Sequence, residues 1–146
     1  MSEENKAVAA RMPLEVFNQG NLDVIDEVIS PEFTDHALPL PGAPSGRDGV
    51  KVYAAAVRQA FPDLKNTINH VIAEGDLVAM HVTSKGTMQG EFAGMPPSGK
   101  QAIWDAVHIT RVRDGKLVEH WVVQDQLGML QQLGFVAAPG AAETAR

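Results

Sequence analysis

The spacing of hydrophobic residues changes once along this chain, close to Leu64. Before that point, apolar residues recur every three to four positions, which is typical of helices with one buried face. The pattern predicts helices over residues 3–19, 22–29 and 46–60. Pro13 lies inside the first of these and removes a backbone donor, so we expect a kink or a break into two pieces there.

After Leu64 the spacing becomes an alternation of two, which is typical of strands with one buried face. Glu74-Gly75-Asp76 and Asp114-Gly115 carry the residues that tight hairpin turns require. Strands are expected over residues 66–73, 77–85, 103–112 and 118–125, with a glycine- and proline-rich interruption over 86–99. Phe33 to His36 forms a further short extended segment, and the stretch LGMLQQL predicts a closing helix.

Three helices followed by an antiparallel meander predict an α+β fold, with a sheet long enough to twist and curl. Helices covering the concave face would leave a cone-shaped cleft, which is a common ligand site. We expect a single domain over residues 1–135. Residues 136–146 have no periodicity and are expected to form a disordered tail.

Composition, charge and missing motifs exclude several kinds of partner and chemistry for this chain. The net charge is −6 with no basic run, which argues against nucleic acid and anionic membrane as partners. The chain has no cysteine, no apolar stretch long enough to span a membrane and no apolar segment typical of a secretory signal. Phosphate-binding and serine-hydrolase motifs are missing, so we expect a cytoplasmic protein that works without a cofactor.

Two histidines, His108 and His120, lie on the last two predicted strands. Counting back from the turn at Asp114-Gly115 suggests that they can face each other on one side of the sheet. They could line the cleft, or they could be core histidines bonded to backbone carbonyls. Asp35, next to His36, leads into a proline-rich loop and is a plausible acid or base.

Other residues could shape the cleft or have simpler roles. Asp125 lies directly before the closing helix and could be its N-cap. No local ligand spacing indicates a metal site, so none is expected. The size and polarity of the cleft would depend on Phe61, Met80, Met95 and Trp104.

Three segments together resemble the SnoaL-like polyketide cyclases, a branch of the NTF2-like superfamily of α+β cones. They are EVFNQGNLDVIDEVISPEF, GTMQGEFAGMPPSGK and VHITRVRDGKLVEHWVVQDQLGMLQQLG, and they span about residues 5–134. The resemblance implies a curved antiparallel sheet, three N-terminal helices, a short C-terminal helix and ring closure by aldol addition. It does not imply one activity, because the superfamily includes several.

By motif, the two pocket histidines of the family fall on His108 and His120, and an early asparagine falls on Asp35. The catalytic aspartate of the family, two residues beyond the second histidine, falls on Val122. A hydrocarbon side chain cannot carry a proton, so this position argues against cyclase chemistry by the usual route.

These observations leave an enzyme and a binding protein as hypotheses. The first is a cofactor-independent isomerase or lyase acting on an apolar carbonyl or hydroxyl compound, with Asp35, His108 and His120 catalytic. Asp35 would be its general base, with a pKa raised by burial. The second is a binding or accessory protein that kept the pocket and lost the aspartate.

Both hypotheses expect a small apolar organic ligand. Substrate contacts are expected from His36, Phe61, Met80, Met95, Trp104, Val122 and Asp125. A third hypothesis is a structural dimer module. A homodimer or higher homo-oligomer fits all three, because Ile103, Val107 and Ile109 would leave the outer sheet face apolar.

Overall fold

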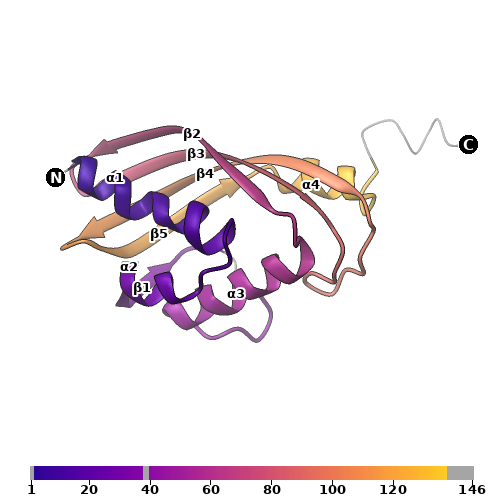
Figure 1. Cartoon of the computed structure of the whole chain (residues 1–146), viewed down its shortest axis with the longest axis horizontal. Helices are drawn as coiled ribbons and strands as arrows, with labels where there is room; N and C mark the ends of the chain where they lie inside the picture. Colours follow the sequence, from indigo (N-terminus) through magenta and orange to yellow (C-terminus); the bar gives the residue numbers. More distant parts are fainter. Residues whose placement is uncertain (1, 38–39, 138–146) are drawn as a thin grey trace, which may run out of the picture.

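The computed structural model describes residues 2–37 and 40–137 as an α+β fold (Figure 1). The elements are α1 (Ser2–Arg11), η1 (Met12–Phe17), α2 (Asp23–Val28), β1 (Ile29–Asp35), α3 (Gly46–Ala60), β2 (Lys65–Glu74), β3 (Leu77–Thr87), β4 (Gln101–Arg113), β5 (Lys116–Gln124) and α4 (Gln126–Leu133). The predicted disordered tail lies outside the described residues from residue 138 onward.

One sheet carries the fold, in the strand order β1-β5-β4-β3-β2. Strands β2 to β5 pair antiparallel, as the two hairpin turns predict. Strand β1 pairs parallel to β5 and was not predicted at this length. It includes Pro31, which has no backbone N–H to donate but is tolerated because β1 is an edge strand.

The stretch before β4 is the other departure from the expected strands. Residues 88–100 form no strand, and their one ladder contact is an isolated bridge between Phe92 and Met95. Ala93 and Gly94, between them, both have positive φ, at 51° and 82°. This segment is therefore a loop with a tight turn, which carries Phe92 and Met95 inward toward the sheet.

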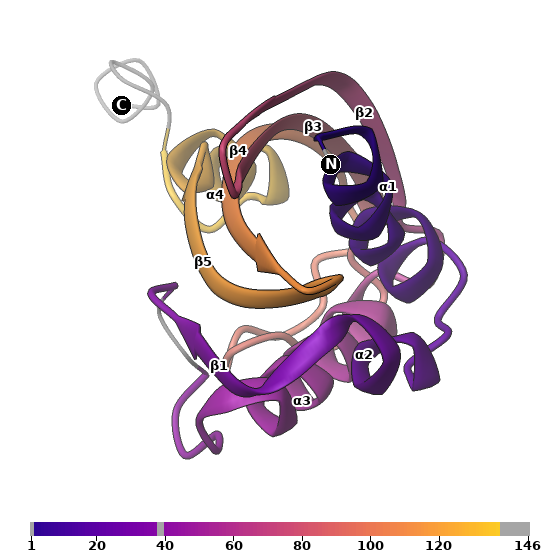
Figure 2. The same ribbon diagram turned by 90° about the vertical axis from the view of Figure 1, so that its left-hand side faces the viewer.

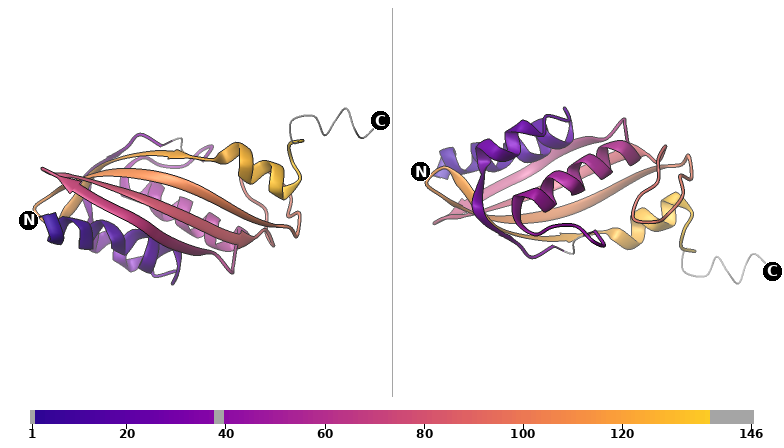
Figure 3. Two further views of the ribbon diagram at one scale, coloured as in Figure 1. Left: turned by 90° about the horizontal axis from the view of Figure 1, so that it is seen from above. Right: turned by 90° about the horizontal axis from the view of Figure 1, so that it is seen from below.

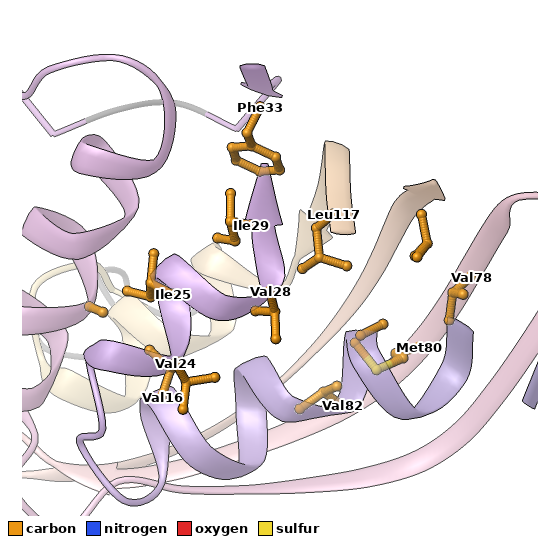
Figure 4. Packing of buried hydrophobic residues seen from close by; sticks show 13 residues of the cluster. Val16, Val24, Ile25, Val28, Ile29, Phe33, Val78, Met80, Val82 and Leu117 are labelled. Carbon is orange, nitrogen blue, oxygen red and sulfur yellow. The ribbon is translucent and has the colours of Figure 1, made fainter. Parts of the chain in front are cut away.

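The sheet curls around α1, η1, α2 and α3, which lie on its concave side (Figure 2; Figure 3, right). Figure 4 shows how apolar side chains of η1 and α2 meet those of β1, β3 and β5, among them Val16, Ile25, Val78 and Leu117. A second apolar cluster joins α3 to α4 through Val57, Trp104 and Leu133. The concave face is therefore the core face.

Burial identifies the residues on each face of the sheet. On β4, the even-numbered residues from Ala102 to Val112 point into the core, while the odd-numbered residues point outward. The outer face is not covered by helices (Figure 3, left). It carries the exposed apolar side chains Ile72, Ile103, Val107, Ile109 and Val123, here called the outer patch.

The first predicted helix breaks where proline was expected to disturb it. Pro13 lies in η1, a π-helical segment directly after α1. Asn18, just beyond η1, exchanges two hydrogen bonds with the backbone of Asn66: Asn66 N donates to Asn18 Oδ1 at 2.7 Å, and Asn18 Nδ2 donates to Asn66 O at 3.0 Å. Ser84 donates from Oγ to Asn66 Oδ1 at 2.5 Å, so a buried polar cluster joins η1 to the sheet.

No helix in the described ranges 2–37 and 40–137 is both long and apolar enough to cross a membrane.

The buried amide cluster predicts a specific stability cost. Replacing Asn66 by Ala should lower the free energy of unfolding by about 1–3 kcal/mol, because the buried Ser84 hydroxyl loses its acceptor. Asn69→Ala is the matched control, since its bond to Thr83 is exposed and its loss should cost less than about 0.5 kcal/mol. Urea denaturation of both variants tests this, and equal costs would contradict it.

Candidate active site

Three side chains predicted from sequence form a continuous chain of hydrogen bonds on the concave face. His120 Nδ1 lies 2.8 Å from Asp35 Oδ1. On its other side, His120 Nε2 lies 2.9 Å from His108 Nδ1. The two imidazole rings stack with their centroids 5.2 Å apart. We call Asp35, His120 and His108 the relay.

Strand pairing brings the relay together. Asp35 is paired with His120 across the parallel β1–β5 ladder, and the backbone N–H of His36 donates to the carbonyl of His120 at 2.9 Å. The register of β4 and β5 places His108 opposite Val122 and His120 opposite Thr110. The two histidines therefore contact each other diagonally, and not directly across as the count from the turn suggested.

With both imidazoles neutral, the hydrogen bonds define where the protons lie. Asp35 can only accept when ionised, so His120 donates its Nδ1 proton to it. The remaining lone pair on His120 Nε2 then accepts the Nδ1 proton of His108. His108 Nε2 is left as a lone-pair acceptor with no hydrogen-bond partner among the described residues.

His108 Nε2 is also not sealed inside the protein. Every fully buried polar side-chain atom in the described residues has a hydrogen-bond partner, so an unpartnered nitrogen must retain accessible surface. Burial, and then the neighbouring charge of His120, lowers the pKa of His108 to about 4. The imidazole is therefore neutral at pH 7 and able to accept a proton.

Asp35 does not have the environment that the sequence predicted for a base. Burial raises the pKa of its carboxyl, but the hydrogen bond from His120 and the charges of the two histidines lower it more, so the net pKa lies below its usual value. Oδ1 also accepts from the backbone N–H of Ala37 at 3.0 Å. The raised pKa was wrong, and Asp35 is placed to hold and orient His120.

Two predicted substrate contacts lie elsewhere. His36 Nε2 is 2.7 Å from Glu119, and its ring stacks on Trp121 with centroids 5.0 Å apart, so His36 lies on the outer face. Asp125 caps α4 by accepting from the backbone N–H of Gly128 at 2.9 Å. Successive side chains on a strand point to opposite faces, and His36 and Asp125 each follow an inward-facing residue. Both side chains therefore point away from the relay.

An apolar cavity of about 80 Å³ lies between α3, the loop before β4, and the sheet. Predicted residues Phe61, Met95 and Trp104 line it, and Gln124 brings it next to the relay strands. Val122, opposite His108, is only partly buried on the same face. Met80 faces inward too: it is paired with His108 across the β3–β4 ladder and belongs to the core cluster under α1 and η1.

A larger hollow of about 520 Å³ lies at the end of the β4–β5 hairpin, but it has a different chemistry. Its lining is polar and charged, and Arg111 there is already paired with Asp76 at 2.7 Å and Glu119 at 3.1 Å. No relay residue lines it. We therefore place the candidate active site at the apolar cavity and the adjoining relay.

Tyr53 lines the apolar cavity and was missed as a site residue. Helical spacing places Tyr53 on the same stripe of α3 as Val50 and Val57, so its position in the sequence resembles that of a core residue. A hydroxyl on an apolar stripe was the available signal. Within the described residues, no group of three or more histidine, aspartate or glutamate side chains is arranged to hold a metal ion.

Comparison with known proteins places this geometry in a family. The family model of the SnoaL-like polyketide cyclases matches residues 7–133. Nogalonic acid methyl ester cyclase of Streptomyces nogalater is 31% identical over 119 residues, covering 81% of this chain and 89% of that protein. Aklanonic acid methyl ester cyclase of Streptomyces peucetius is 31% identical over 132 residues, covering 85% and 87%.

Solved structures agree with the sequence relatives. The structure of IdmH from Streptomyces antibioticus superimposes with a TM-score of 0.76 at 36% identity, covering 89% of this chain and 98% of that one. Fold, sequence and the matched range are consistent with one another, and this chain belongs to the SnoaL-like polyketide cyclase family.

Proposed function

We propose that this protein is an enzyme that transfers a proton on an apolar carbonyl compound without a cofactor. The observation that carries the proposal is the relay, which ends in a neutral, unpartnered imidazole nitrogen. The apolar cavity favours an uncharged substrate, and two relatives are named as cyclases of methyl esters, in which a carboxylate charge is masked. The chemistry belongs to the cyclase, isomerase and dehydratase group.

In this proposal His108 is the general base. Its Nε2 takes a proton from the carbon next to the substrate carbonyl, and the bonding electrons move toward the carbonyl oxygen as an enolate forms. In an aldol closure the enolate carbon then attacks a second carbonyl of the same molecule, and the resulting alkoxide takes the proton back from His108. The base is thereby restored at the end of the cycle.

The rest of the relay compensates for the low basicity of a buried imidazole. When Nε2 gains a proton, the Nδ1 proton of His108 can move to His120 Nε2 along the 2.9 Å contact. The positive charge then lies on His120, directly beside the Asp35 carboxylate at 2.8 Å. Asp35 thus stabilises the protonated relay and need not accept the proton itself.

The relay also accounts for the hydrocarbon at position 122. Val122 faces His108 on the neighbouring strand, so a base carried by His108 serves the same part of the concave face. The second candidate function rests on the same valine: a binding protein that retains the pocket without catalysing a reaction. In that case the relay would be a structural network.

We further propose that a second copy of the chain covers the outer patch. Ile72 on β2 and Val123 on β5 are 67% and 79% exposed, and the patch includes Ile109 and Val107 on β4, one of the two strands between them. Lys65 and Lys85 lie paired at one end of this face, and Glu74 lies at the other. A two-fold axis running across the strands would place each end against its opposite charge.

Removing the base should abolish proton transfer. 4-Fluoroacetophenone in deuterated water tests this without knowledge of the natural substrate, because its methyl protons exchange when an enolate forms. His108→Ala should slow the exchange by about 100-fold or more. His81→Ala is the control, because His81 also bonds an aspartate and a histidine but lies on the outer face. Exchange that is unaffected by His108→Ala would contradict the base assignment.

The pH dependence of the same exchange tests Asp35. The wild-type rate should fall as the pH drops through the pKa of His108, about 4, because the protonated imidazole cannot accept another proton. The charge of Asp35 raises that pKa, so Asp35→Asn should move the acid limb to lower pH and also reduce the plateau rate. An acid limb that moves upward in Asp35→Asn would overturn this role.

Val122→Asp separates the two candidate functions. If the relay performs the role that the resemblance assigns to a carboxylate at position 122, the wild-type protein should already cyclise aklanonic acid methyl ester. Val122→Asp should then increase cyclase activity only slightly. A binding protein would be inactive and would gain activity from the substitution. Val123→Asp, which adds the same charge on the outer face, is the control. Liquid chromatography of the product decides, and inactivity of wild type with gain in the variant would refute the enzyme proposal.

Self-association is tested at the centre of the outer patch. Val107→Glu should shift the protein from dimer to monomer in sedimentation velocity, because two buried carboxylates would face each other across the two-fold axis. Leu14→Glu introduces the same charge at a residue of similar exposure, 42% against 44%, outside the patch. A monomeric wild type, or a monomer produced equally by both variants, would exclude this interface.

A further inference from the structure

Tyr53 is the one tyrosine of the chain, and its hydroxyl is not explained by packing. Its ring, on α3, meets Phe17 and Phe92 edge to face with centroids 6.2 and 6.1 Å apart. The hydroxyl has no hydrogen-bond partner among the described residues. Because no fully buried polar side-chain atom there lacks a partner, this hydroxyl must retain accessible surface.

The position of Tyr53 links the cavity to the relay. Tyr53 lines the apolar cavity with Trp104 and Gln124. Gln124 is paired with Ala106, one inward-facing position along β4 from His108. Burial raises the pKa of Tyr53, and the charge of Asp35 raises it further, so the hydroxyl keeps its proton at pH 7. No relay residue is itself part of the cavity lining.

We propose that the Tyr53 hydroxyl donates a hydrogen bond to the reacting carbonyl oxygen of the substrate. The inference rests on the proposed function and adds the group that opposes the base. When His108 Nε2 removes the proton from carbon, the C–H electron pair forms a C=C bond and the carbonyl electrons move to oxygen. A neutral hydroxyl in an apolar wall is suited to stabilise that oxygen charge, because it brings no charge of its own.

Few other side chains that line the cavity could donate a hydrogen bond to a substrate oxygen. The other lining side chains are aromatic, aliphatic or thioether, apart from the amides of Gln124 and Gln126. An enolate oxygen held in this cavity therefore has one hydroxyl donor available within the lining. This arrangement also favours a ketone or ester over a carboxylate, since the lining contains no cation to pair with a second charge.

A pair of isosteric ligands tests the hydrogen bond directly. 4-Fluoroacetophenone and 4-fluoro-α-methylstyrene differ in having a carbonyl oxygen or a methylene group, and fluorine NMR reports the binding of each. The wild type should prefer the ketone by about fivefold or more, the value of one hydrogen bond. Tyr53→Phe keeps the ring between Phe17 and Phe92, so it should lose this preference while binding the styrene within about twofold of wild type.

Two results would overturn the assignment. One is a ketone preference that survives Tyr53→Phe, and the other is a wild type that shows no preference for the ketone. Hydrogen exchange on the ketone gives an independent readout: Tyr53→Phe should lower kcat about tenfold or more, with KM changed less and the acid limb near pH 4 retained. An unchanged kcat would likewise exclude a donor that acts in the transition state.

The exchange rate and the preference for the ketone distinguish an error in the His108 assignment from an error in the Tyr53 assignment. His108→Ala should abolish exchange but keep the preference for the ketone, because Tyr53 remains. If His108→Ala exchanges normally while Tyr53→Phe loses the preference, the proposed function is wrong and the Tyr53 contact stands. If exchange depends on His108 and the preference does not depend on Tyr53, the relay stands and the donor is wrong.

Discussion

The parallel pairing of β1 with β5 is the contact on which the candidate site depends. It adds a fifth strand to an otherwise antiparallel sheet and brings Asp35 level with His120, 85 residues later in the chain. Without this edge strand, His120 would lack the carboxylate that determines its tautomer. The backbone bond from His36 to the carbonyl of His120 holds the last residues of β1 against the relay.

The relay changes how the hydrocarbon at Val122 is understood. The resemblance to the family implies a carboxylate at position 122, and this chain has there a side chain that cannot hold a proton. Its neighbour across the ladder is His108, whose free nitrogen faces the concave side and whose second nitrogen is held by His120. In the proposed function the proton is therefore taken by a residue of β4, and the carboxylate that supports it lies on β1.

The outer face provides a useful contrast. His70, His81 and Asp105 form a second array there, with contacts of 3.1 Å between the two histidines and 3.1 Å from His81 to the carboxylate. The residue types are the same as in the relay. The contacts of the outer array are exposed to solvent, whereas burial on the concave face makes His108 a neutral acceptor at physiological pH. Residue type alone therefore does not define a site.

Local sequence determined the elements. The change of hydrophobic spacing near Leu64, the two glycine-containing turns and Pro13 indicate the helices, the hairpins and the interruption of the first helix, because these depend on residues close together in the chain. Asp35, His108 and His120 could be named as candidates in the same way. Only tertiary structure decided that β1 joins the sheet, that His36 and Asp125 face away, and that Tyr53 borders the cavity. Those outcomes depend on register and on long-range packing, which no short window of sequence specifies.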